Sequence, residues 1–157
     1  MRNLVYINGN GHLGKAAFEV VTYAKKLGGT VTVLATGNMS SDLLGKLGTY
    51  GANEVVINRA ITGNDDQQIA AWIATKATGA DNIIFSNDFN GKAIAPAVAV
   101  KLHAGIVTGA NNLPDTSNGF SVTKTVFSGK AFAQINIDTP VKVISINQNC
   151  FGVHMHE

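Results

Sequence analysis

Short apolar runs alternate with segments of helical period through the first two-thirds of this 157-residue chain, and no other feature of the sequence restricts its fold as much. The runs are rich in Val and Ile and lack a clean apolar–polar alternation; they cover residues 4–7, 31–35, 54–57, 83–85 and 106–107. Uninterrupted apolar runs of this length are typical of strands that are buried on both faces of a parallel sheet.

Helical segments separate the expected strands. Each places apolar side chains on one face at a spacing of three or four residues, and a glycine follows its last turn. The clearest carry Phe18, Val21 and Leu27 before Gly28; Ile69, Trp72 and Ile73 before Gly79; and Ile94, Val98 and Leu102 before Gly105. Repeated strand–helix–strand units predict a Rossmann-like α/β fold with a mostly parallel sheet flanked by helices. Trp72 is expected in its core.

The pattern changes in the last third of the chain. Turn residues separate three further runs, 120–127, 130–137 and 141–146. We interpret them as consecutive strands with short turns, which gives the sheet an antiparallel strand segment near the C-terminus. Because no linker or repeat interrupts the chain, residues 1–151 are expected to form one domain, followed by a tail over 152–157.

Charge and composition exclude several classes of protein. Only 14% of residues are charged and the net charge is +2, so the sequence offers no basic stripe for nucleic acid. No apolar run approaches the ~18 residues of a membrane helix, and no direct membrane insertion is expected. The single cysteine, Cys150, fits a reducing compartment, so a cytoplasmic location is expected.

The first glycine-rich loop matches a dinucleotide-binding pattern. Gly9-Asn10-Gly11-His12-Leu13-Gly14 reads G-x-G-x-x-G between a strand and a helix. The second expected strand, however, ends in Ala35-Thr36-Gly37-Asn38, without the acid that would hold a ribose. A glycine-rich turn is therefore favoured over an NAD site.

A polar loop over residues 87–92 follows the fourth expected strand, at the edge where open α/β sheets bind ligands. Backbone N–H groups at a helix entrance, together with the Lys92 cation, suit a phosphate. Asn90, Gly91 and Lys92 are the candidate binding residues. The alternative is that Asn90 caps the helix, Gly91 turns the backbone and Lys92 is solvated. Because Pro96 would break a helix that started much earlier, we expect the helix to begin near Ala93.

No catalytic or metal-binding constellation is evident. The four histidines are scattered or terminal, Cys150 has no basic neighbour in sequence, and Lys92 precedes Ala93 instead of the hydroxyl residue of a Walker motif. His154 and His156 belong to the expected tail. The sequence therefore predicts neither an enzyme nor a metal site.

Three blocks of sequence resemble the N-terminal domain of the electron transfer flavoprotein alpha subunit. They are residues 24–34, residues 91–107, and residues 128–133 leading to 139–146, and the resemblance covers roughly 2–151. It implies a fold like that of adenine nucleotide alpha hydrolases, in a heterodimer with a beta subunit. It also implies a non-enzymatic, FAD-containing carrier of electrons from flavin dehydrogenases to a quinone-linked acceptor of the respiratory chain. The chemistry would belong to the flavin.

The resemblance also sets limits. In this family FAD lies mainly in a second domain, and that domain would begin about where this sequence stops. We therefore expect no tightly bound cofactor on this chain alone and assign it no FAD-contacting residue. Whether the sequence is an excised fragment or a naturally short relative stays open.

The family's beta subunit binds an adenine nucleotide with the loop equivalent to 87–92. Asn90, Gly91 and Lys92 are accordingly the candidates here for an adenine nucleotide such as AMP. The competing hypothesis is a stand-alone adenine-nucleotide-binding module of the same fold. A pyrophosphatase-type enzyme is disfavoured because Asn8-Gly9-Asn10-Gly11 lacks a serine and an acid.

Overall fold

The computed structural model describes residues 2–8, 15–36, 48, 51–58, 66–77, 80–86, 89–110, 121–126, 131–137, 139 and 141–146. These residues contain eight strands and three helices. Along the chain they are β1 (Arg2–Asn8), α1 (Lys15–Leu27), β2 (Thr30–Thr36), β3 (Glu54–Asn58), α3 (Asp66–Lys76), β4 (Asn82–Ser86), α4 (Phe89–Leu102), β5 (Gly105–Ala110), β6 (Ser121–Val126), β7 (Ala131–Asn136) and β8 (Lys142–Ile146).

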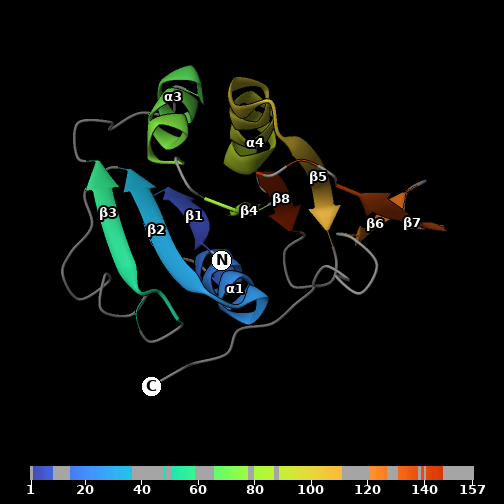
Figure 1. The fold of residues 1–157 in the computed structure, drawn as a ribbon, viewed down its shortest axis with the longest axis horizontal. Helices are drawn as coiled ribbons and strands as arrows, with labels where there is room; N and C mark the ends of the chain where they lie inside the picture. Colours follow the sequence, from blue (N-terminus) through green and yellow to red (C-terminus); the bar gives the residue numbers. More distant parts are fainter. Residues whose placement is uncertain are drawn as a thin grey trace.

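All eight strands join one sheet in the order β3-β2-β1-β4-β8-β5-β6-β7. The first six of that order pair in parallel, whereas β6 is antiparallel to β5 and β7 is antiparallel to β6. In Figure 1 the sheet lies between α1 on one side and α3 and α4 on the other, and β6 and β7 extend it at one end. The expected α/β class, with helices on a mostly parallel sheet and an antiparallel segment late in the chain, is confirmed.

The grouping of the last strand with that antiparallel segment is wrong. β8 lies between β4 and β5 and is parallel to both, with Ile144 opposite Ile84 on one side and Val107 on the other. Residues 143–146 are all buried, as a central strand with two neighbours requires. The turn residues before 141 indicated a change of direction but carried no information about which strands the next one would join.

The connection from β7 to β8 passes directly against the start of β5. Thr139 Oγ1 accepts the N–H of Gly105 at 2.8 Å and donates to the carbonyl of Val141 at 2.7 Å. A Cβ atom at Gly105 would lie 2.7 Å from Ile137 Cγ2 and 3.1 Å from Thr139 Oγ1. Glycine at this position therefore lets the connection pack closely against the start of β5 before the chain enters β8 in the middle of the sheet.

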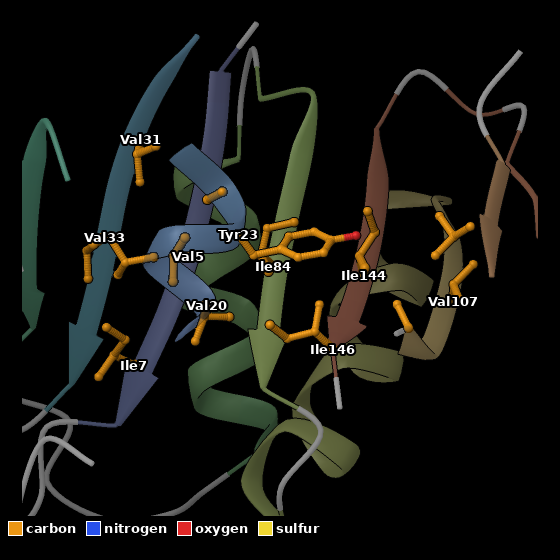
Figure 2. Packing of buried hydrophobic residues seen from close by; sticks show 14 of the residues in the cluster. Val5, Ile7, Val20, Tyr23, Val31, Val33, Ile84, Val107, Ile144 and Ile146 are labelled. Carbon is orange, nitrogen blue, oxygen red and sulfur yellow. The ribbon is translucent and has the colours of Figure 1, made fainter. Parts of the chain in front are cut away.

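The core has two layers, one on each face of the sheet. On the α1 face, Val20, Val21, Tyr23 and Ala24 of the helix pack with side chains from most of the strands. Figure 2 shows the Tyr23 ring between Ile84 and Ile144, with its hydroxyl directed toward β8. On the other face the core residues of the helices are Ile69, Ala70 and Ile73 of α3 and Ile94, Ala95, Val98 and Ala99 of α4. Trp72, expected in the core, is only partly buried at its margin.

Helix α4 begins at Phe89, four residues before the expected start, with Pro96 inside it. Proline at this position removes one hydrogen bond, to the carbonyl of residue 92, and its ring is exposed. The burial of Ile94 and Val98 on the opposite side of the helix outweighs that local loss. None of the described helices has the length and apolar content needed to cross a membrane.

Helix α4 ends at a residue in the left-handed backbone conformation. His103 has φ +52°, its N–H bonds the Val100 carbonyl at 3.3 Å, and the N–H of Ala104 bonds the Ala99 carbonyl at 2.9 Å. This pair of bonds is the Schellman arrangement, in which the left-handed position is usually glycine. Gly105, expected as the stop signal, is instead the first residue of β5.

Candidate functional site

The predicted binding residues lie at the start of α4, at the carboxyl ends of the parallel strands. β4 ends at Ser86 and α4 begins at Phe89, so Asn90, Gly91 and Lys92 occupy its first turn. The first four N–H groups of a helix have no acceptor within it, and the helix dipole is positive at this end. The structure thus puts the backbone of the three predicted residues on the first turn of α4, whose amides have no acceptor within the helix. Their side chains lie outside the described part of the structure.

Two polar side chains sit on the same face of the sheet as α4, near the carboxyl ends of β1 and β2. The hydroxyl of Tyr6 and Oγ1 of Thr36 lie 3.0 Å apart and both residues are buried. The Tyr6 ring also packs against Phe85 of β4, with ring centroids 6.0 Å apart. This cluster positions the ends of three neighbouring strands. The sequence analysis missed it, although the polar Thr36 directly after an apolar strand was a usable signal.

The amino ends of the strands carry a second set of side-chain hydrogen bonds. Asn3 Nδ2 donates to the carbonyls of Gly28 at 2.7 Å and Ala24 at 3.3 Å, so a side chain from β1 holds the end of α1. Asn3 Oδ1 accepts from Asn82 Nδ2 at 2.8 Å. Asn82 Oδ1 is buried without a hydrogen-bond partner among the described residues. The sequence analysis missed this pair as well, yet an asparagine directly before each of two apolar runs pointed to it.

Three further side-chain bonds fasten the same end. Val31 N donates to Asn53 Oδ1 at 2.9 Å at the start of β2, and Arg2 N donates to Asp81 Oδ2 at 2.8 Å. Gly105 N bonds Thr139, as described above. The amino end therefore has a structural role, since each bond joins a strand start to a neighbouring segment.

Tyr23 carries a phenol that is buried in the core on the α1 face of the sheet. Burial raises the pKa of the Tyr23 phenol well above its ordinary value, because the apolar core disfavours the charged form. No group of three or more His, Cys, Asp or Glu side chains gathers among the described residues to hold a metal. The glycine-rich loop 9–14, Cys150, His154 and His156 lie outside them.

Comparison with known proteins identifies the family. The model of the electron transfer flavoprotein domain matches residues 3–155. The chain is 28% identical over 134 residues to an electron transfer flavoprotein subunit alpha of Syntrophomonas wolfei, a match that covers 82% of this chain and 42% of that protein. It is 23% identical over 147 residues to the subunit alpha of Bacillus subtilis, covering 89% of this chain and 45% of that protein.

The chain spans less than half the length of these two curated relatives. The family model, in contrast, covers nearly all of it. The sheet, its two helix layers and this match lead to one conclusion: the chain belongs to the electron transfer flavoprotein family, and the relatives it resembles are alpha subunits.

Proposed function

We propose that this chain is the N-terminal domain of an electron transfer flavoprotein alpha subunit and acts as scaffold and docking domain for a beta-type subunit. One observation carries the proposal: the family domain covers nearly all of this chain, but the chain covers less than half of its alpha-subunit relatives. The family domain matches residues 3–155, whereas the alpha-subunit relatives extend to more than twice this length. A domain of this kind contributes binding surface and rigidity to a carrier whose chemistry resides in its flavin.

In the proposed carrier, FAD is held mainly by a second domain outside this sequence. Electrons pass from flavin dehydrogenases to that FAD and then to a quinone-linked acceptor. This chain supplies no catalytic group and holds no flavin tightly by itself. The single cysteine of the sequence fits a reducing compartment, so we place the carrier in the cytoplasm.

The start of α4 supports a nucleotide role within the same domain. Asn90, Gly91 and Lys92 are proposed to bind the phosphate of an adenine nucleotide such as AMP. The free amides of the first turn would donate to phosphate oxygens, and the helix dipole would add ~0.3–1 kcal/mol. This placement also supports the second candidate function, a stand-alone adenine-nucleotide-binding module.

The docking proposal is tested by mixing the purified chain with a beta-type subunit of the same family and measuring native mass and the ultraviolet–visible spectrum. A one-to-one complex without a flavin band is expected. Failure to associate with the cognate beta subunit would contradict docking. A flavin band from this chain alone would contradict the proposed division between the two domains.

The nucleotide proposal is tested by calorimetry with AMP, ADP and ATP. Lys92→Gln is expected to weaken binding about tenfold, since it removes a charge-assisted contact to phosphate. Lys101→Gln is the matched control, because Lys101 lies in the last turn of the same helix, at its opposite end. Equal losses in both variants would contradict the assignment. Micromolar binding together with no beta-subunit association would favour the stand-alone module.

A further inference from the structure

The two outer strands of the sheet differ in chemistry. β3 and β7 stand at the two ends of the strand order, so each has one neighbour among the described strands. An outer strand presents a row of main-chain N–H and C=O groups with which a strand of another chain can pair. A protected row is typical of a strand that stays unpaired, whereas an unprotected row indicates a site for pairing.

β3 carries a charge at its outer edge. Its first residue, Glu54, is exposed. Val55 and Ile57 pack against the core on the α1 face, and Val56 packs against the core on the opposite face. A charged side chain on an outer strand is one of the devices by which natural sheets prevent pairing with other chains. β3 is therefore a protected edge.

β7 lacks such a device. Its six residues, Ala131–Asn136, include no charged residue, no proline and no glycine. Short segments of this composition favour strand pairing between chains. The ladder to β6 is unbroken from Ser121↔Asn136 to Val126↔Ala131, so no bulge turns the edge away. In Figure 1, β6 and β7 extend beyond the described helices, which lie over the other strands.

The ladder with β6 uses the main chain of β7 on one side. In an antiparallel pair, alternate residues direct both N–H and C=O toward the same neighbouring strand. Every second residue of β7 therefore directs these groups away from β6. No described strand lies on that side to receive them.

From this unprotected edge, we propose that β7 pairs antiparallel with β7 of a second copy, so that two chains share one continuous sheet across a two-fold axis. Pairing centred on Ala133 and Gln134 places Phe132 opposite Ile135 of the second copy, and pairs of aromatic and β-branched residues stabilise antiparallel strands. No like charges meet along β7, because it has none. The same edge serves both copies, as a two-fold interface requires, and the charge of Glu54 disfavours further growth at β3.

The contact is small, so the dimer is expected to be weak. Interfaces smaller than about 1,200 Å² belong mostly to transient complexes, and one pair of six-residue strands falls in that class. Self-association with a Kd of roughly 1–100 µM is expected. It needs neither a beta-type subunit nor a nucleotide, so it stands or falls independently of the proposed function.

Native mass spectrometry and light scattering of the full chain over ~1–100 µM measure the self-association. The test variant is Ala133→Lys with Gln134→Lys, which brings cations of the two copies opposite each other at the centre of the pairing. Its counterpart of opposite charge is Ala133→Glu with Gln134→Glu. Glu54→Lys on β3 is the matched control, because it changes the net charge by as much as the lysine double. Far-ultraviolet circular dichroism checks that all variants fold.

The unsubstituted chain is expected to form dimers at the upper end of this range and no larger species. Each β7 double should weaken dimerisation at least about tenfold, and Glu54→Lys less than about twofold. A mixture of the lysine and glutamate doubles should form a mixed dimer, because opposite charges then meet. A chain that stays monomeric throughout, equal weakening by Glu54→Lys, or no mixed dimer would overturn the proposal, whether or not a beta-type subunit binds.

Discussion

The described residues at the two ends of the parallel sheet make different kinds of side-chain hydrogen bonds. At the amino end, side chains of Asn3, Asn53, Asp81 and Thr139 bond the backbone of neighbouring segments. At the carboxyl end, the Tyr6 hydroxyl and Thr36 Oγ1 form a hydrogen bond between two described strands, and the segments that follow the strands there lie outside the described residues. The amino end fixes how strands and helices are joined. The carboxyl end, where open α/β sheets bind ligands, holds the first turn of α4, whose N–H groups have no acceptor within the helix.

This contrast predicts that substitutions at the amino end cost stability, whereas those at the carboxyl end cost less and affect binding. Because the two ends share the same strands, the difference must come from the side chains and not from the sheet itself.

Asn3→Ala should lower the free energy of unfolding by about 2 to 4 kcal/mol, since it leaves Asn82 Nδ2 and the carbonyl of Ala24 buried without their partner. Urea unfolding measures the loss. Asn82→Ala is the control and should cost less, because it also removes the Oδ1 atom that lacks a partner among the described residues. Equal costs for the two variants would mean that Asn3 does not hold the end of α1.

Gly105→Ala should destabilise by about 1 to 3 kcal/mol, because the new Cβ would meet Ile137 Cγ2 and Thr139 Oγ1. Differential scanning calorimetry follows the change in Tm. Combining it with Ile137→Ala relieves the closest contact, so the double variant should lose less than the sum of the single losses. Strict additivity would argue against the close crossing of the β7–β8 connection.

Tyr23 lies in the core, so its effect on stability tests burial of the phenol. Its raised pKa means that, above pH ~10, the unfolded chain releases the phenolic proton while the folded chain keeps it. The unfolded state then binds fewer protons, so stability falls as pH rises, with a slope approaching ~1.4 kcal/mol per pH unit. Urea unfolding on either side of pH ~10 measures this change, and the free energy of unfolding of Tyr23→Phe should fall less steeply with pH than that of the unsubstituted chain. An unchanged slope would contradict a buried, neutral phenol.

Tyr6→Phe tests the carboxyl end and should cost about 0.5 to 1.5 kcal/mol by removing the bond to Thr36. Pairing it with Thr36→Val replaces both polar partners by apolar groups of similar shape, which should recover most of that loss. If Tyr6→Phe costs as much as Asn3→Ala, the contrast between the ends fails.

His103→Gly should stabilise the chain by about 0.5 to 1 kcal/mol, because glycine adopts the φ of +52° without a Cβ penalty. The Schellman bonds at the end of α4 are backbone bonds and stay intact. His103→Ala retains a Cβ atom at the left-handed position and should leave stability nearly unchanged. The difference in the free energy of unfolding between the two variants therefore measures the cost of that Cβ atom.

Much of the fold follows from sequence pattern. The apolar runs at 4–7 and 31–35 lie within β1 and β2, and the helix expected to end before Gly28 is α1 (Lys15–Leu27). These elements are long, periodic and bounded by glycine, so local pattern and tertiary packing agree. The position of β8 could not be found this way, because strand partners depend on contacts between residues far apart in the chain.

The candidate site was predictable only in part. Sequence placed Asn90, Gly91 and Lys92 at a helix entrance, but it set the start of α4 too late by treating Pro96 as a stronger breaker than its exposed side allows. The Asn3–Asn82 pair brings together residues that are 79 positions apart. An asparagine before each of the two apolar runs is a signal for both residues, but the sequence does not show that β1 and β4 are neighbours, so the sheet was needed to establish the contact.

The place of β8 also governs the order in which the chain can fold during synthesis. Of the described strands, β8 leaves the ribosome last, yet it completes the middle of the sheet. Until it emerges, β4 and β5 are separate edges that lack their shared neighbour, and β3-β2-β1-β4 is divided from β5-β6-β7. Open edges of this kind invite pairing with other chains. The nascent chain therefore stays vulnerable to misassembly until residues 142–146 close the gap.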